Sequence, residues 1–425
     1  MMNMLKVAFV PVGKAALAAV GFGISVYVGR TLGSEAFGIY AAGTTMVVVF
    51  AGIIQHVADA AYLRAIDQMD ADQEHVAIRA NIALRVLGVV GSVGLILLGY
   101  AVAQNGGFEL PFSGLMIAMI CAGVAATVLM SIPQIIHQSR QHYGRYLALD
   151  MAMYALRVSG LVALTLAGKF TTLLAFVVQA AAPALSIFGS PARLGPAASA
   201  PQIRAAMGHM VRLGGWIGLA FVFSIVTGKL DLLMLAFLGS AKDAGLYAAA
   251  INLAIIAEFA GAFLLVVYYP NVLRWYREGT LRRVLLQFLA VAVPLACIVG
   301  WVAVSNAQPI METVFGVEYS ASGPIFAVLL PLTLFMLTVQ PVAAPFINLR
   351  APHILCIIEG VGLIAIIAAL LIFIPSHGAM GAAWSMFAIR GSVGLAILGW
   401  ALFSARPDAE TDIVATPDLK TEAQI

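Results

Sequence analysis

Long apolar runs separated by short polar segments make up most of this chain. The runs are too long and too uniformly apolar for membrane strands, which alternate apolar and polar positions over short segments. About 20 apolar residues are enough for one helical crossing of a bilayer. The pattern therefore predicts twelve spanning helices, at residues 5–29, 37–60, 81–103, 112–136, 146–168, 170–190, 210–236, 243–269, 284–305, 322–347, 354–374 and 378–403.

Two polar stretches divide the predicted spans into units. Residues 191–209 are rich in Pro, Ala and Gly, and residues 405–425 are polar and acidic with no apolar face. We expect an N-terminal six-helix lobe at 1–190, a cytoplasmic linker at 191–209, a C-terminal six-helix lobe at 210–404 and a disordered cytoplasmic tail at 405–425.

An internal repeat relates the two predicted lobes. The first hairpin reads LGSEAFGIYAA from Leu32, and the seventh-to-eighth hairpin reads LGSAKDAGLYAA from Leu238, with Gly38 aligned to Gly245 after one insertion. The offset is about half the chain, and the even number of intervening spans gives both copies one orientation. We expect an all-α integral membrane fold: about 12 transmembrane helices in two six-helix lobes, related by a pseudo-two-fold axis along the membrane normal, around a central cavity.

Lysine and arginine positions predict how the chain is oriented. Cytoplasmic loops carry an excess of these residues. Three cations fall on one side of the predicted spans, namely Arg30, Lys169 and Lys242, and four fall within spans. The other sixteen, Arg85 among them, lie on the opposite side. Both termini are therefore expected in the cytoplasm, in the inner membrane of a bacterium.

Composition excludes several classes of protein. Hydrophobic residues make up 62% of the chain and charged residues 10%, against about 25% charged in soluble domains. A net charge of +3 is too small to indicate nucleic acid as a partner. The three cysteines lie inside apolar runs in no metal-binding or disulfide pattern. We find no catalytic or metal-binding cluster and no phosphate loop, so the sequence predicts neither an enzyme nor a bound cofactor.

Charges inside predicted spans are candidates for function, because they are costly in lipid. Lys14, Arg157 and Arg390 fall near the middle of three helices, and Lys229 lies in the outer half of the seventh span. Cations converging on a cavity would attract a phosphate, which suits the fork of arginine. We expect Lys14, Arg157, Arg390 and Lys229 to bind substrate.

Acidic residues leave alternatives open. Asp231 and Glu258 are candidates for coupling to H⁺ or Na⁺. The structural alternative is a set of internal salt bridges, for example Arg390 with Glu258 or Glu359; Arg157 and Asp150 are about 10 Å apart along one helix, too far for direct contact. In the tenth span, three prolines predict a bend that serves as a hinge.

Several motifs resemble those of one family. Residues 29–40 (GRTLGSEAFGIY) are similar to the first-loop signature of Wzx-type polysaccharide flippases, in the multidrug/oligosaccharidyl-lipid/polysaccharide (MOP, MATE-like) exporter superfamily. Four further segments agree in order and spacing: DAAYLR at 59–64 (with Ala61 where glycine is usual), KLDLLMLAFLG at 229–239, FGVEYSASGP at 315–324 and HGAMGAA at 377–383.

The resemblance implies a function. It would be to move an undecaprenyl-pyrophosphate-linked oligosaccharide from the cytoplasmic to the outer leaflet, driven by an ion gradient or the membrane potential. The product would be O-antigen (lipopolysaccharide), capsule or exopolysaccharide. Implied partners are the lipid-linked oligosaccharide, membrane lipids, H⁺ or Na⁺, and a polysaccharide polymerase with its export machinery. No family motif fixes the positions of Lys14, Arg157 or Arg390.

Other functions compete with this one. A multidrug cation antiporter of the same superfamily would carry acids in the first or seventh span, but the first span here holds Lys14 and only Asp231 keeps that option open. A lipid II flippase would typically have two more spans. A membrane glycosyltransferase would usually show a large outer loop with catalytic residues, and a purely structural subunit would not need charges at mid-membrane.

Overall fold

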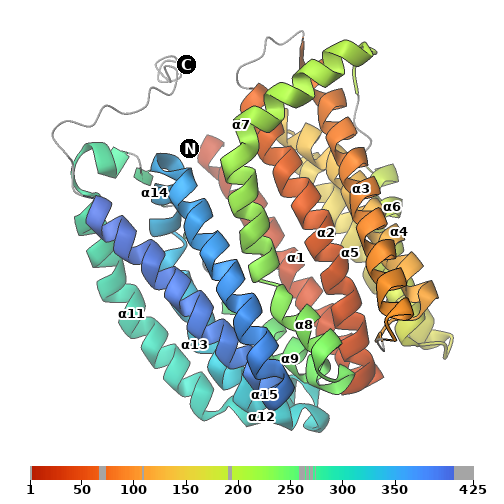
Figure 1. The fold of residues 1–425 in the computed structure, drawn as a ribbon. Coiled ribbons are helices and arrows are strands. Elements are labelled where there is room, and N and C mark those ends of the chain that lie inside the picture. The colour runs from red at the N-terminus through yellow and green to blue at the C-terminus, as the bar shows by residue number, and fades with distance from the viewer. Residues whose placement is uncertain are drawn as a thin grey trace.

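The chain folds entirely into helices and connecting turns over the part that the computed structural model describes, which is residues 2–66, 73–107, 110–189, 194–257, 264, 268, 271–272 and 274–405 (Figure 1). The long helices of the first half are α1 (Met2–Leu32), α2 (Ser34–Ile66), α3 (Glu74–Asn105), α4 (Gly114–Ser139), α5 (Tyr143–Leu166) and α6 (Thr172–Ser186). The second half holds α7 (Ala200–Thr227), α8 (Leu230–Leu238), α9 (Ala241–Ala254), α11 (Leu281–Ser305), α12 (Ala307–Phe315), α13 (Gly323–Val339), α14 (Ala343–Arg350) and α15 (Pro352–Ser404). The predicted all-helical membrane fold is confirmed.

Nine helices within the described ranges are long and apolar enough to cross a membrane, or ten if the bent pair Ala200–Leu213 and Gly218–Thr227 forms one span. The later part of the predicted eighth span, beyond α9, lies largely outside the described ranges. The predicted tail from residue 406 onward also lies outside them. The total of twelve crossings and the division into two six-helix lobes therefore stay predictions.

The predicted linker and seventh span differ from the structure. Helix α7 begins at Ala200, because Pro201 occupies its first turn and the Gln202 side chain accepts a hydrogen bond from the Ser199 amide at 2.9 Å. The last ten residues of the predicted linker 191–209 are thus helical. The expected span 210–236 is also not continuous, because the helix stops at Thr227 and α8 starts at Leu230.

The predicted tenth span is broken where its prolines cluster. Helix α13 ends at Val339 and α14 starts at Ala343, so the helix is interrupted immediately around Pro341. Proline lacks the amide hydrogen needed to continue an α-helix and clashes with the preceding turn. The helix is thus broken at the place where a bend was expected, and the use of this place as a hinge stays a prediction.

Helix α15 is one long helical segment that folds back on itself. Its backbone leaves helical geometry at Gly378, where φ is +53°. The Arg390 guanidinium lies 3.2 Å from the Glu359 carboxylate, although a straight helix would separate them by about 46 Å at 1.5 Å per residue. The two halves of α15 therefore run side by side in opposite directions, as the predicted eleventh and twelfth spans require.

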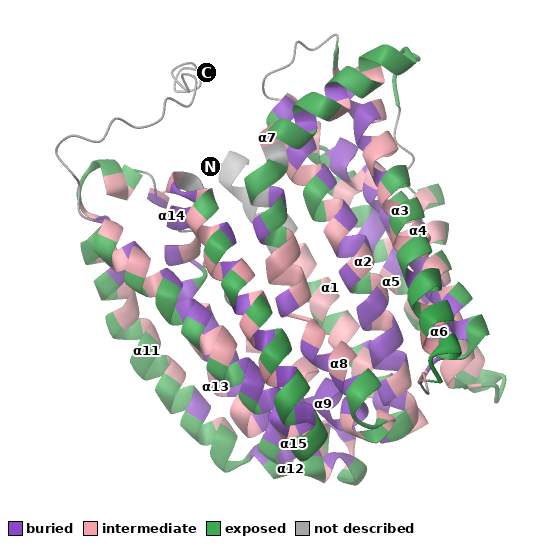
Figure 2. Ribbon diagram, in the orientation of Figure 1, coloured by how far each residue is buried: buried purple, intermediate pink, exposed green. Residues whose placement is uncertain are grey.

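Polar contacts close one end of the molecule. The amide and hydroxyl of Ser34 donate to the Glu318 carboxylate at 2.7 and 2.6 Å, and the Tyr319 hydroxyl donates to the Gly29 carbonyl at 2.9 Å. Arg30 donates to the carbonyls of Thr313 and Val314. These contacts join the α1–α2 turn to α12 and the short 3-10 helix η3 (Val317–Ser322), at the end opposite the start of α1 and the end of α15 (Figure 1). Buried residues gather at this closed end (Figure 2).

The repeat predicted from the sequence meets itself at the closed end. Helices α2 and α9 both begin there (Figure 1), and they cross at Gly38 and Gly245. A methyl group on Gly38 would lie 1.9 Å from the Ala241 carbonyl oxygen, and one on Gly245 would lie 1.7 Å from the Ser34 carbonyl oxygen. The shift in residue number that takes Gly38 to Gly245 also takes Ser34 to Ala241. The two contacts are therefore equivalent to each other, as contacts around a two-fold axis are. The crossing is therefore locally two-fold symmetric.

We expect Gly38→Ala and Gly245→Ala each to reduce the yield of folded protein sharply, because neither backbone can move away from the added methyl group without separating α2 from α9. Overpacking of this kind costs about 1–3 kcal/mol or more. Gly91→Ala and Gly94→Ala in α3 are matched controls, since nothing lies within 4 Å of a methyl group at either site. Size-exclusion profiles of detergent-purified protein measure the effect, and equal profiles for all four variants would contradict the close crossing.

Candidate functional site

Helices from both halves of the chain enclose a cavity of about 270 Å³. Helix α2 of the first half forms one wall, and α7, α9, α13 and α15 of the second half form the others. A second cavity of about 320 Å³ shares part of this lining and extends it to Glu359. The polar residues that line the first cavity are His56, Ser224, Lys229, Thr333, Gln340 and Arg390.

The break between α7 and α8 places Lys229 at the cavity. Gly228 caps the end of α7, and Lys229 has a non-helical backbone before α8 begins. An interrupted helix of this kind is stable inside a membrane only where it is buried in protein or lines a polar cavity. Lys229 forms no ion pair with any residue in the described part of the chain.

Arg390 reaches the same cavity from α15. Glu359, on the other half of the hairpin, holds one of its guanidinium nitrogens at 3.2 Å, and both side chains are largely buried. This is one of the salt bridges that the sequence left open. The guanidinium has five N–H donors, and a single carboxylate contact leaves donors for a ligand in the cavity. Of the four cations proposed to bind substrate, Lys229 and Arg390 are thus brought together.

Lys14 and Arg157 lie elsewhere, among α1, α4 and α5. Lys14 donates to Asp150, which also accepts from the Gln134 amide at 2.8 Å. The Arg157 guanidinium packs on the Tyr154 ring, 5.5 Å from its centroid, and its buried Nε has no hydrogen-bond partner among the described residues. Neither cation lines the two cavities that surround Arg390.

Of the two acids predicted to couple ions, one is described. Asp231 is almost fully buried in the first turn of α8, where it accepts a hydrogen bond from the Tyr247 hydroxyl at 2.5 Å. It also accepts one from the Leu232 amide at 2.8 Å. Glu258 lies outside the described residues.

One ionic cluster was misassigned from the sequence. Arg85 was counted among the cytoplasmic loop cations, but its side chain is fully buried between α2, α3 and α4. It donates to Asp59, to Ser131 and, at 2.7 Å, to the Asn81 side chain. The signal available in the sequence was Asn81 one helical turn before Arg85, on the same face. An arginine needs that support when it lies inside the bundle.

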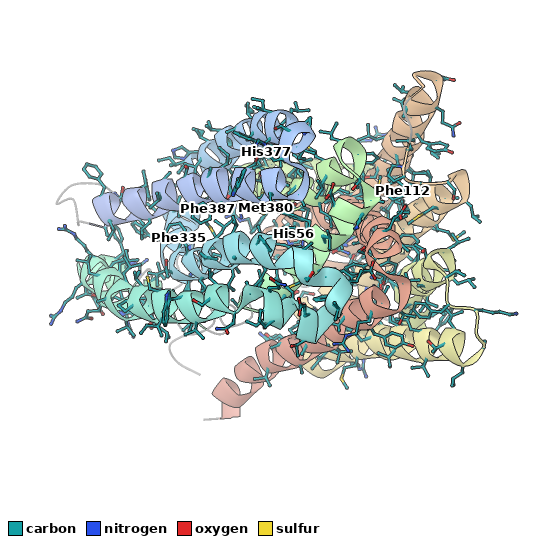
Figure 3. The ribbon with its side chains drawn as sticks, turned by 90° about the horizontal axis from the view of Figure 1, so that it is seen from below. His56, Phe112, Phe335, His377, Met380 and Phe387 are labelled. Atoms are coloured by element: carbon teal, nitrogen blue, oxygen red, sulfur yellow. The ribbon has the colours of Figure 1, made fainter. Side chains whose placement is uncertain are left out.

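His56 was also missed. It was not among the site residues predicted from the sequence, although its side chain is exposed at the cavity and the centroid of its ring lies 5.6 Å from that of Phe221. Viewed from the closed end, His56 lies near the centre of the molecule (Figure 3). Hydrophobic periodicity in a fully apolar helix cannot show which face a single polar residue occupies.

Comparison with protein families matches residues 6–274 to the family described as polysaccharide biosynthesis protein. The chain belongs to this family. The predicted relationship to polysaccharide biosynthesis proteins is thereby confirmed. Comparison with curated protein sequences finds no match.

Solved structures with the same fold include transporters and a flippase. The lipid II flippase MurJ in an inward closed conformation has a TM-score of 0.69 at 12% identity, covering 93% of this chain and 88% of that chain. An inward-facing MATE-family multidrug transporter of the MOP superfamily scores 0.63 at 13% identity, covering 94% and 98%. The Vibrio cholerae MATE transporter VcmN in its bent form scores 0.58 at 14% identity, covering 94% and 97%. At these identities, the likeness establishes the fold of this polysaccharide biosynthesis family member.

We expect the Arg85 cluster to act in stability. Arg85→Ala would leave the Asp59 carboxylate without its counter-charge and lower the free energy of unfolding by about 3–5 kcal/mol. Arg282→Ala, at an exposed position in α11, is the matched control and should change it by less than about 0.5 kcal/mol. Unfolding in detergent, followed by cysteine accessibility or thermal denaturation, measures both. If Arg85→Ala is as stable as the control, the cluster is not structural.

Proposed function

We propose that this protein moves a lipid-linked oligosaccharide across the bacterial inner membrane, from the cytoplasmic to the outer leaflet. The carrier would be undecaprenyl pyrophosphate, and the product a surface polysaccharide such as O-antigen, capsule or exopolysaccharide. Membership of the polysaccharide biosynthesis family and a fold shared with MOP-superfamily transporters support a flippase.

The observation that carries the proposal is the pairing of Lys229 and Arg390 at one cavity between the two halves of the chain. The diphosphate of a carrier lipid is a compact dianion. Lys229 supplies an uncompensated charge, and Arg390 offers a planar donor fork that matches phosphate oxygens. The amide of Gln340 adds a neutral donor at the same cavity, whereas the Thr333 hydroxyl already donates to the Leu329 carbonyl at 3.0 Å.

The shape supports an alternating-access mechanism. One end is closed by the Ser34–Glu318 and Arg30–carbonyl contacts, and both described chain ends lie at the opposite end (Figure 1). If those ends are cytoplasmic, as the loop charges predict, this conformation faces inward. An ion gradient or the membrane potential would drive the cycle, with Asp231 and Glu258 as proposed coupling residues. Lys14 and Arg157 remain proposed contacts for the anionic part of the substrate.

Two related functions are the competing candidates. The MATE-like fold is compatible with a multidrug cation antiporter, but Lys229, which has no ion-pair partner in the described part of the chain, repels a cationic drug at the cavity. The likeness to MurJ is compatible with lipid II as the substrate, which carries the same diphosphate. The diphosphate site is common to both flippase functions, and the sugar attached to it distinguishes them.

We expect Lys229→Gln to slow the transfer of a fluorescent prenyl diphosphoryl-sugar across proteoliposome membranes by about ten-fold or more, as loss of one charge-assisted contact predicts. Arg390→Gln alone would also leave Glu359 unpaired, so the double variant Arg390→Gln/Glu359→Gln removes the arginine without an orphaned acid. Lys169→Gln, at an exposed position between α5 and α6, is the control. Wild-type rates in the Lys229 and double variants at normal protein levels would overturn the proposed site.

A further inference from the structure

The cavity contains a histidine whose neutral tautomer is fixed by the backbone. The Nδ1 of His56 lies 2.9 Å from the Gly52 carbonyl oxygen, which can only accept a hydrogen bond. Nδ1 therefore carries the hydrogen in the neutral ring, and Nε2 is the basic nitrogen. No described residue hydrogen-bonds to Nε2, and the side chain is exposed at the cavity wall. Imidazole is the side chain that most readily changes charge near neutral pH.

The charged groups around His56 give a simple balance. On α2 itself, Asp59 lies nearly one turn further on, where it is paired with Arg85. From α15, Arg390 is paired with Glu359. The surfaces that α7, α9 and α13 present to the cavity carry no charged side chain, and Lys229 stands at the α7–α8 break. From α8, Asp231 lies two residues from Lys229; it is not part of the cavity lining, and it accepts hydrogen bonds from the Tyr247 hydroxyl and the Leu232 amide. Lys229 is the one cation lining this cavity that has no ion-pair partner within the described ranges.

A diphosphate diester carries two negative charges at neutral pH, so a cavity with one uncompensated cation is short of one positive charge. Desolvating an unneutralised charge is costly, and a nearby anion favours the protonated form of an imidazole. We propose that His56 takes up a proton at Nε2 when a diphosphate binds, and that the resulting imidazolium and Lys229 together neutralise the two phosphate charges. This inference rests on the proposed diphosphate site and adds to it a proton-linked residue.

The sign of the linkage follows from the charge states. The proposal has binding convert a neutral ring into a cationic one, so binding consumes a proton. Affinity for a diphosphate should therefore rise as the pH is lowered from about 8 to about 6, where the ligand's own charge stays constant. A ligand with a single phosphodiester charge is matched by Lys229 alone and should bind without proton uptake.

Isothermal titration calorimetry of the full chain in lipid nanodiscs tests the proposal. The probe is a short-chain citronellyl diphosphoryl-N-acetylglucosamine, titrated at pH 7.5 in two buffers of different ionisation enthalpy. The dependence of the observed heat on buffer gives the number of protons taken up. For the wild type we expect uptake approaching about one proton per ligand, as a single imidazole predicts. The singly charged citronellyl phosphoryl-N-acetylglucosamine should give none.

The variants distinguish a failure of this inference from a failure of the proposed diphosphate site. His56→Gln should still bind the diphosphate, with about ten-fold lower affinity, no proton uptake and no pH dependence of affinity. His377→Gln, an exposed histidine at the bend of α15, should behave as the wild type. Diphosphate binding without proton uptake, or uptake that persists in His56→Gln, would overturn the role of His56 while leaving the diphosphate site intact. A wild type that does not bind the probe would overturn the site and the proton linkage together.

Discussion

The bilayer core offers no water to a charged side chain, so each ionic group inside this bundle must find a counter-charge among the helices or face a polar cavity. Most of the described intramembrane charges follow the first course. Arg85 pairs with Asp59, Lys14 with Asp150 and Arg390 with Glu359, and each pair joins different helices or different halves of one hairpin. Ion pairs therefore connect helices of the bundle to one another.

Three described charges do not follow this course: Arg157 packs on the Tyr154 ring, Asp231 accepts hydrogen bonds from neutral groups, and Lys229 lines a cavity. Lys229 has no acidic partner in the described part of the chain, and it sits where the helix itself is interrupted beside a cavity. An unpaired ammonium group and the unsatisfied backbone groups at a helix end both need polar partners. Because the unpaired Lys229 and the helix break occur at the same place, this place has the features of a ligand site and differs from the salt bridges between helices. Arg390 belongs to both groups, since its acidic partner occupies only part of its donor set.

Much of the architecture follows from the apolar pattern because lipid imposes one dominant rule on length and polarity. The helical class, the break near Pro341 and the hairpin at Gly378 were all predictable from local sequence. The start of α7 was missed although its Ser199–Gln202 capping signal is local, because the surrounding Pro, Ala and Gly residues suggested a linker. The break at Gly228 was missed because a Gly-Lys pair inside an apolar run looks like any other buried charge.

The site was less predictable than the fold, and for a physical reason. A sequence gives the depth of a charge but not its direction around the helix axis, and the direction decides whether it meets a partner or a cavity. Arg85 was placed in a loop because it lies at the edge of an apolar run, yet its side chain reaches inward to Asp59. Lys14, Arg157, Lys229 and Arg390 were all recognised as intramembrane cations, but the sequence could not show that only the last two share a cavity.

The crossing of α2 and α9 has a consequence for how such a chain changes over generations. Gly38 and Gly245 are equivalent positions of one repeat, and each touches the backbone beside the other. If the repeat arose by duplication of a half-length gene, the ancestral protein met a second copy of itself at this glycine, and one codon governed both sides of the contact. After fusion the two codons could change independently. The backbone contact still leaves no space for a side chain at either position, so both positions remain glycine while the surrounding halves diverge.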